Sequence, residues 1–193
     1  IHDVNGLKDF LKTRLLHMSA QQDMVALHSA MDFYHQGDES SLLSLDMRLS
    51  AMKTAKETRD ASTRTGRQTL RTILALQYDP FLAAYQESIQ LNQAQGHFAL
   101  VFGIICASMH IEKRAALVAF GYSQLSGQVS SSIKLMRMGQ TSAQSVLLSL
   151  QSTIYEAAEI ALQRSSDEMQ SFAPGLDISA MQHEYLFRRL FNS

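Results

Sequence analysis

Residues that interrupt helices or cross-link small domains are scarce in this sequence. Its 193 residues include two prolines, Pro80 and Pro174, and one cysteine, Cys106. A single cysteine excludes an internal disulfide and is typical of a reducing compartment, so we expect a cytoplasmic protein. Alternation of apolar and polar residues, which is the pattern of strands, is not sustained anywhere. Together these absences favour an all-α fold.

The sequence also lacks a large net charge and a long apolar run. A net charge of −1 argues against a dedicated nucleic-acid-binding protein. The most apolar stretch, residues 98–109, is shorter than the roughly 20 residues that a membrane-spanning helix needs. We therefore expect neither nucleic acid nor membrane as a partner. We interpret residues 98–109 as a buried core helix and Cys106, which lies inside it, as a buried and unreactive thiol.

Catalytic and metal-binding motifs are missing as well. The sequence contains no nucleophile elbow, no phosphate-binding loop and no dinucleotide-binding fingerprint. His183 and Glu184 begin like the His-Glu-x-x-His motif of zinc hydrolases, but Phe187 occupies the position of the second histidine. His28 and His35 lie about 10 Å apart along a helix, too far to share one ion. We therefore predict no catalytic residue, cofactor or metal site, and solvated or half-buried histidines.

Residues 1–193 are expected to form a single domain. Helix caps and breaks divide this domain into a bundle of roughly eight to ten helices. Ser19 and Gln22 form a capping box, Gly37 is a break, and Asp79-Pro80 is a helix start. The predicted helices cover residues 4–16, 19–36, 40–49, 53–75, 97–109, 112–137, 141–164 and 177–191, with a further helix after Pro80.

Small side chains crowd the predicted helix 112–137. They include Ala115, Ala116, Ala119, Gly121 and Ser123. Small residues let helix backbones approach closely, so this composition is typical of a helix at the centre of a bundle or of one in a homodimer seam. Both interpretations remain open from the residues alone.

Basic residues recur along the predicted helix 53–75, at Lys53, Lys56, Arg64, Arg67 and Arg71. They could form a solvent-facing stripe in which Asp60 pairs with Arg64, or a docking face for an acidic protein surface. Gly66 costs this helix about 1 kcal/mol relative to alanine, which indicates a closely packed neighbour, either another helix or a partner.

Gly139 marks a corner between two predicted helices. Because glycine tolerates the left-handed conformation at a helix C-terminus, we expect Gly139 to end the first helix in that conformation. Lys134 and Arg137 lie in its last turn, where positive charge suits the helix dipole. Thr141 and Gln144 form a capping-box pattern for the second helix.

The chain closes with an amphipathic segment. Pro174 and Gly175 end the preceding element, and Asp177 can cap a docking helix over residues 177–191. This helix is rich in aromatic residues and carries two arginines. We expect it to dock on its own domain or on a partner.

These segments together resemble the UreF family of urease accessory proteins over nearly the whole chain. The corner matches through Lys134, Gln140 and Gln144, the terminal signature through Met181, His183, Glu184, Arg189, Leu190, Phe191 and Ser193, and the family's arginine-rich helix through Glu57, Arg59, Gly66 and Arg67. Two features depart from the family pattern. The corner near Met136 has no proline, and the family's N-terminal Leu-Pro-x-Gly segment is missing, so we expect the sequence to begin downstream of it.

The resemblance implies an all-α scaffold, not an enzyme, that assists nickel insertion into the urease apoprotein. It further implies a homodimer that binds a UreD/UreH-type partner and recruits or gates a UreG-type GTPase. The residues implied in docking the UreD/UreH-type partner are His183, Glu184, Tyr185, Arg188, Arg189, Leu190 and Phe191. The corner residues Lys134, Arg137, Gln140 and Gln144 would face the GTPase or the dimer mate, and Glu57, Arg59, Gly66 and Gly139 would be structural.

Two other classes of function are compatible with the residues. One is an α-helical adaptor or regulator unrelated to urease, and urease genes beside its own gene would argue against it. The other is a metal-dependent helical enzyme, which would carry stoichiometric metal after purification.

Overall fold

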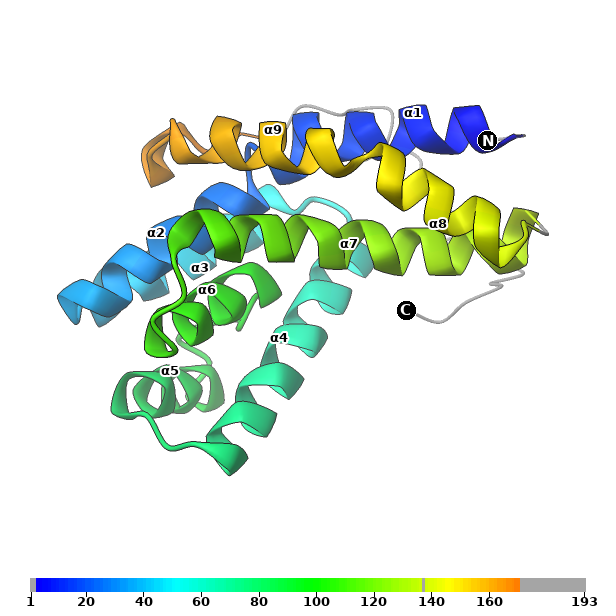
Figure 1. Cartoon of the computed structure of the whole chain (residues 1–193). Helices are drawn as coiled ribbons and strands as arrows, with labels where there is room; N and C mark the ends of the chain where they lie inside the picture. The colour runs from blue at the N-terminus through cyan, green and yellow to red at the C-terminus, as the bar shows by residue number, and fades with distance from the viewer. Residues whose placement is uncertain (1–2, 137, 171–193) are drawn as a thin grey trace.

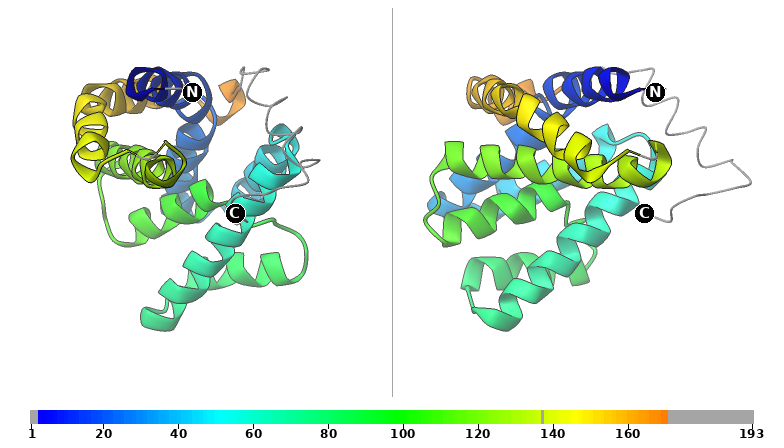
Figure 2. Two further views of the ribbon diagram at one scale, coloured as in Figure 1. Left: turned by 90° about the vertical axis from the view of Figure 1, so that its right-hand side faces the viewer. Right: turned by 45° about the vertical axis from the view of Figure 1, so that its right-hand side comes forward.

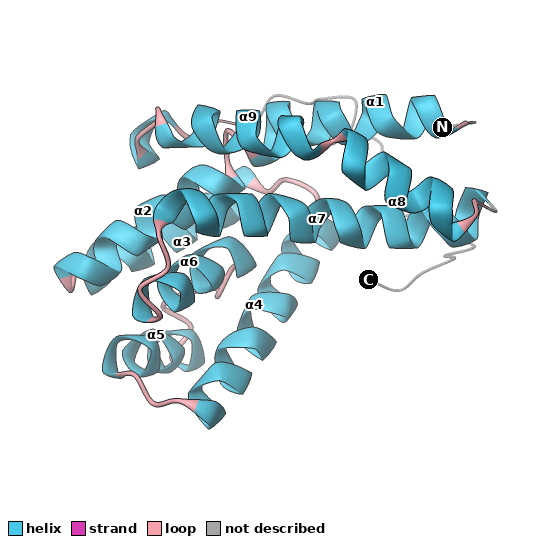
Figure 3. Ribbon diagram, viewed as in Figure 1, coloured by secondary structure: helices cyan, strands magenta, loops and turns pink. Residues whose placement is uncertain are grey.

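The computed structural model describes residues 3–136 and 138–170. Within these ranges the chain forms nine α-helices and no strand (Figures 1 and 3). The helices are α1 Val4–Arg14, α2 Asp23–Gln36, α3 Glu39–Met52, α4 Lys56–Leu76, α5 Pro80–Gln90, α6 Phe98–Ser108, α7 Lys113–Met136, α8 Gln140–Ser149 and α9 Gln151–Leu162. A π-helical segment, η1 (Leu15–Ser19), prolongs α1, and a 3₁₀ turn, η2 (Ser166–Glu168), follows α9. The predicted all-α bundle is confirmed.

The centre of the bundle is the crossing of α2 and α6. Every residue of α2 from Met24 to Met31 is buried, and α6 is buried over most of its length. Gly103 of α6 lies directly against the carbonyl oxygen of Leu27 in α2, where a Cβ atom would collide. The core helix predicted over residues 98–109 is therefore confirmed, with Cys106 buried inside it. No described helix has both the length and the apolar character that a bilayer crossing requires.

The remaining helices cover this centre from two sides. Helices α1 and α9 lie at the top of Figure 1, with α7 and α8 below them, and α7 packs on both α9 and α2. On the other side α4 packs on α6. It then slants away from α7, and its last turns lie beside α5 at the bottom of the view (Figure 2).

Local signals correctly predicted several helix boundaries. Gly37 ends α2 in the left-handed conformation, with φ of 67°. The Asp79 carboxylate accepts a hydrogen bond of 2.9 Å from the Leu82 N–H at the start of α5. Asp38 caps α3 in the same way through the Ser41 N–H, so that helix starts one residue before the predicted Ser40.

The capping box predicted at Ser19 and Gln22 does not form. The Ser19 hydroxyl instead donates a hydrogen bond of 2.6 Å to the side-chain oxygen of Gln124 in α7. The first helix widens into η1 at this point, and α2 begins at Asp23 without a side-chain cap. The local pattern predicted that the Ser19 hydroxyl would cap α2. In the structure this hydroxyl is used instead in a tertiary hydrogen bond to Gln124, 105 positions away along the chain.

The single helix predicted over residues 141–164 is two helices, α8 and α9. They meet at Leu150, whose N–H bonds back to Leu147 O in a tight turn. Neither glycine nor proline stands at this break, and Leu150 itself is buried. The apolar spacing continues through the break, so the sequence pattern gave no sign of the change in direction.

The α2–α6 crossing leads to a stability prediction. We expect Gly103→Ala to lower the free energy of unfolding by about 1–3 kcal/mol, because the new methyl group meets backbone that cannot move aside. Gly127→Ala is the matched control, since a Cβ atom at that position in α7 meets nothing within 4 Å. It should raise stability by about 0.5–1 kcal/mol. Urea denaturation measures both changes, and equal effects would contradict the close crossing.

Candidate functional site

The segment that joins α5 to α6 is held against α4 at Gly66. A Cβ atom on Gly66 would collide with the Gly96 carbonyl oxygen and would lie 2.8 Å from Phe98 N. A close neighbour of Gly66 is thus confirmed, but it is the segment that leads into α6, and the expectation of another helix or a partner at this position is wrong. Gly96 itself has φ of 77°, a conformation that favours glycine.

A buried carboxylate holds the same loop from the other side. Asp46 of α3 is completely buried, and its two oxygens accept hydrogen bonds from three successive backbone N–H groups. These donors belong to Gln95, Gly96 and His97, and the last two distances are 3.1 Å. Such hydrogen bonds to a charged acceptor are stronger than neutral ones, and they replace the water that the carboxylate loses on burial.

The His97 side chain extends this network to α4. Its Nδ1 atom lies 3.1 Å from the Ser62 hydroxyl oxygen, which also accepts a hydrogen bond of 3.3 Å from the Phe98 N–H. Burial lowers the pKa of the His97 imidazole from 6.5 to about 4, and the nearby Asp46 charge only partly opposes this. The ring is therefore neutral at pH 7. The prediction of solvated or half-buried histidines is wrong for His97 and for His28, which are both buried.

One residue of the predicted basic stripe, Lys53, is part of this internal network, and Arg59, which is not in the stripe, joins it. The Lys53 ammonium is buried and forms an ion pair of 2.7 Å with Asp23, and Arg59 donates to the Lys53 carbonyl oxygen at 2.8 Å. Lys53 precedes α4 and caps the end of α3, so it does not share a face with the later cations. The expected Asp60–Arg64 pair is not formed, because Asp60 pairs with Lys56 at 2.7 Å.

A cavity of about 370 Å³ opens beside this network. Its lining includes the charged residues Arg14, Asp23, Lys53 and Glu57, together with Ser62. Glu57 and Arg59, which the family resemblance marks as structural, thus lie next to the buried ion pair. Sequence reasoning missed Asp46 and His97, because the groups that they contact are 35 to 51 residues away along the chain.

The α7 helix has two faces, and only one of them is used inside the bundle. Ala116 is buried, and Gly121 lies close to Met24 and Ile154, with a Cβ position 3.0 and 3.1 Å from their side chains. Ala115 and Ala119 on the other face are exposed. The small residues therefore serve internal packing, as one interpretation predicted, and also leave a shallow outer surface.

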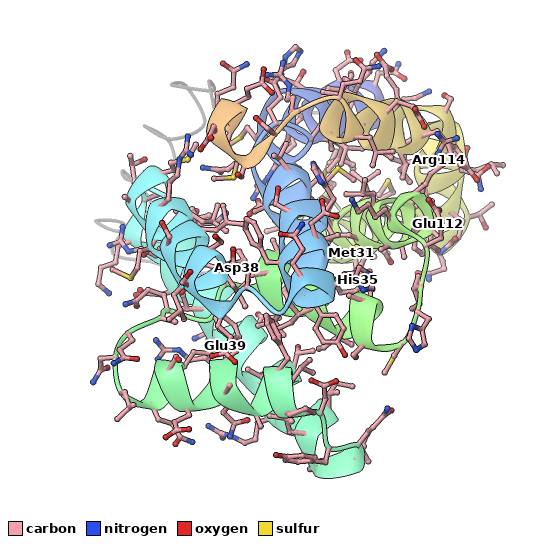
Figure 4. The ribbon with its side chains drawn as sticks, turned by 90° about the vertical axis from the view of Figure 1, so that its left-hand side faces the viewer. Met31, His35, Asp38, Glu39, Glu112 and Arg114 are labelled. Atoms are coloured by element: carbon pink, nitrogen blue, oxygen red, sulfur yellow. The ribbon has the colours of Figure 1, made fainter. Side chains whose placement is uncertain are left out.

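This outer surface of α7 forms an apolar groove with α9. Its volume is about 600 Å³, and its walls include the half-buried Val118 and the exposed Tyr122 and Tyr155. The groove ends near Glu112 and Arg114 at the start of α7, which Figure 4 shows beside α9. Arg114 forms an ion pair of 3.1 Å with Glu159 there. An apolar groove with two exposed tyrosines and a charged rim is the composition of a protein-binding surface.

The corner after α7 differs from the prediction. Gly139 has φ of −69° and ψ of 154°, an extended conformation, and it precedes α8 instead of ending α7 in the left-handed region. The Thr141–Gln144 capping box is absent, because α8 already begins at Gln140 and has no side-chain cap. Gln140 and Gln144 are both exposed. The Lys134 side chain and Arg137 lie outside the described part of the chain.

Comparison with known proteins identifies the family. The UreF family model matches residues 1–151. The chain belongs to the UreF family. Relatives named urease accessory protein UreF come from Haemophilus influenzae strain PittEE, 32% identical over 187 residues, and Actinobacillus pleuropneumoniae serotype 5b, 31% identical over 188 residues. Both alignments cover 97% of this chain, and 80% and 83% of the relatives. A Bacillus relative (strain TB-90) is 30% identical over 164 residues, covering 85% of this chain and 72% of the relative.

The UreF-family residues expected at the terminus stay a prediction. The docking helix 177–191, with His183, Glu184, Tyr185, Arg188, Arg189, Leu190 and Phe191, lies outside the described residues. Within residues 3–136 and 138–170, no group of three or more His, Cys, Asp or Glu side chains is placed to hold a metal ion.

The buried imidazole predicts how stability depends on pH. Because the folded chain binds a proton at His97 only near pH 4 and the unfolded chain near pH 6.5, the neutral ring stabilises the fold fully above pH 6.5. This contribution, about 3 kcal/mol, is lost as the pH falls from 6.5 towards 4. We expect the free energy of unfolding, measured with urea, to fall over that window.

His97→Gln provides the control for this prediction. The variant should be less stable at pH 7, but its stability should depend less steeply on pH between 6.5 and 4, because the titrating group is gone. An unchanged slope would show that other groups cause the acid sensitivity.

Proposed function

We propose that the chain is a non-catalytic scaffold in urease maturation. The main support for this proposal is the exposed, tyrosine-lined groove between α7 and α9. The chain belongs to the UreF family, and its relatives are named urease accessory proteins. In this proposal the scaffold binds a UreD/UreH-type partner and recruits or gates a UreG-type GTPase. The assembly then assists nickel insertion into the urease apoprotein.

We assign the α7–α9 groove to a homodimer seam. The exposed alanines of α7 allow a second helix to approach closely, and the two tyrosines offer large, rigid contact areas. In a two-fold dimer the same surface serves both subunits, so Tyr122 of one copy would contact the groove of the other. In this proposal the corner residues Gln140 and Gln144, which are exposed, would act with Lys134 and Arg137 as a surface that faces the GTPase or the dimer mate.

The seam assignment is tested by charge substitution. Tyr122→Asp should convert the dimer to a monomer, because it buries an unpaired carboxylate in the seam. Met47→Asp on α3 is a matched control, since both side chains are 48% exposed. Size-exclusion chromatography with light scattering measures the mass of each variant. A wild-type monomer, or a Tyr122→Asp dimer, would refute the seam.

The scaffold role is tested by deleting the last ten residues, 184–193. If the terminal helix docks the UreD/UreH-type partner, the shortened chain should not co-elute with that protein of its organism in size-exclusion chromatography. It should keep most of its helicity in circular dichroism, because the described bundle ends before these residues.

The full chain serves as the control in the deletion experiment. It should take up the UreD/UreH-type protein and then the UreG-type GTPase. Co-elution of the shortened chain would remove the terminal docking helix from the proposal. A full chain that binds neither protein would contradict the scaffold role and favour an unrelated adaptor.

A further inference from the structure

The outer face of α4 is an exposed row of arginine and glutamine side chains. Arg64, Gln68, Arg71 and Ala75 follow at steps of four, three and four residues, and all four are exposed. At 1.5 Å per residue this row is about 16 Å long. It lies on the part of α4 that slants away from α7 in Figures 1 and 2.

The positive charge of this row is not neutralised within the described structure. Residues 61–76 contain no aspartate or glutamate. Neither the Arg64 side chain nor the Arg71 side chain forms an ion pair or hydrogen bond with any described residue. Arg67, by contrast, donates to the Gln95 carbonyl oxygen at 2.8 Å and helps to hold the α5–α6 loop. Two guanidinium groups therefore remain available to a carboxylate from outside.

A less polar row runs beside the arginines. The Thr69 and Thr72 hydroxyls donate to the carbonyl oxygens of Thr65 and Gln68, each at 2.9 Å, so their hydrogen bonds are made within the helix. The two hydroxyls are therefore already satisfied and offer a partner no free donor. The row continues to Leu76 and, just past the helix end, Tyr78. At 79% and 77% exposure these are the most exposed large apolar side chains in the described part of the chain.

We propose that this α4 face, defined by Arg64, Gln68, Arg71, Leu76 and Tyr78, docks an acidic protein surface with an apolar centre. The inference rests on the proposed scaffold function, and it places the partner among the other proteins of urease maturation. Complementary charge around an apolar contact is the pattern of a specific protein interface.

The same features disfavour two other occupants. A second copy packed symmetrically through α4 would bring the two arginine rows together, and like charges repel. A nucleic acid would meet only two available arginines on this face, and only one aromatic side chain, Tyr78, on which a base could stack. An acidic protein surface satisfies both the arginines and the apolar row.

Photo-crosslinking locates the partner. Tyr78 is replaced by p-benzoylphenylalanine, a photoreactive aromatic residue, in the full chain assembled with the urease subunits and accessory proteins of its organism. Irradiation should link position 78 to an acidic segment of one of these proteins. Met47→p-benzoylphenylalanine on α3 should give no adduct on that segment.

The R64E/R71E variant should reduce the Tyr78 adduct and weaken binding of the linked protein about 10-fold or more at low salt.

A matched charge control separates docking from a general charge effect. K8E/K12E on α1 changes the net charge by the same amount as R64E/R71E, and both lysines belong to another part of the surface. It should leave the adduct and the affinity near wild type. Equal losses in both variants would overturn a specific α4 face.

The other possible outcomes of the crosslinking experiment also test the α4 proposal. An assembly that forms normally without a Tyr78 adduct would refute the α4 proposal and leave the scaffold role intact. Adducts to a second copy or to nucleic acid would refute the acidic protein partner. A wild-type chain that does not assemble at all would overturn the scaffold role, and the α4 proposal with it.

Discussion

The described fold depends on one buried carboxylate, that of Asp46. A charged group without water is stable only when its hydrogen bonds are replaced, and the N–H groups of Gln95, Gly96 and His97 provide them. This contact fixes the segment that enters α6, and the close approach of Gly96 to Gly66 sets that segment against α4. Because α6 crosses α2 at the centre, the polar contact positions the apolar core.

Internal contacts use only one face of the peripheral helices, and this leaves outer faces for other molecules. In α4, Gly66 and Leu70 face inward while Arg64 and Arg71 face outward. In α7, Ala116 and Gly121 pack inward while Ala119 and Tyr122 remain exposed. Such outward faces are the places where the described part of this UreF-family chain can contact another molecule.

Much of this arrangement could be predicted from local sequence, because local chemistry determines it. Gly37 and Asp79-Pro80 act on their own helix ends, and the apolar run in α6 is buried wherever it packs. The failures share a different cause. Ser19 bonds to Gln124, and Asp46 and His97 bond to groups more than 30 residues away. A pattern in one segment does not reveal a partner that folding brings from another, and the break at Leu150 has no local signal either.

The two candidate surfaces lie at different ends of the bundle, and this matters for a scaffold. The α7–α9 groove belongs to the upper layer of Figure 1, whereas the exposed end of α4 lies at the bottom with α5. Separate surfaces allow two proteins to be bound at once without competing for space. The rigid link between them is the α2–α6 crossing, since α7 packs on α2 and α4 packs on α6. A partner on α4 would therefore be held in a fixed orientation relative to a second subunit on α7, which is what an ordered assembly requires.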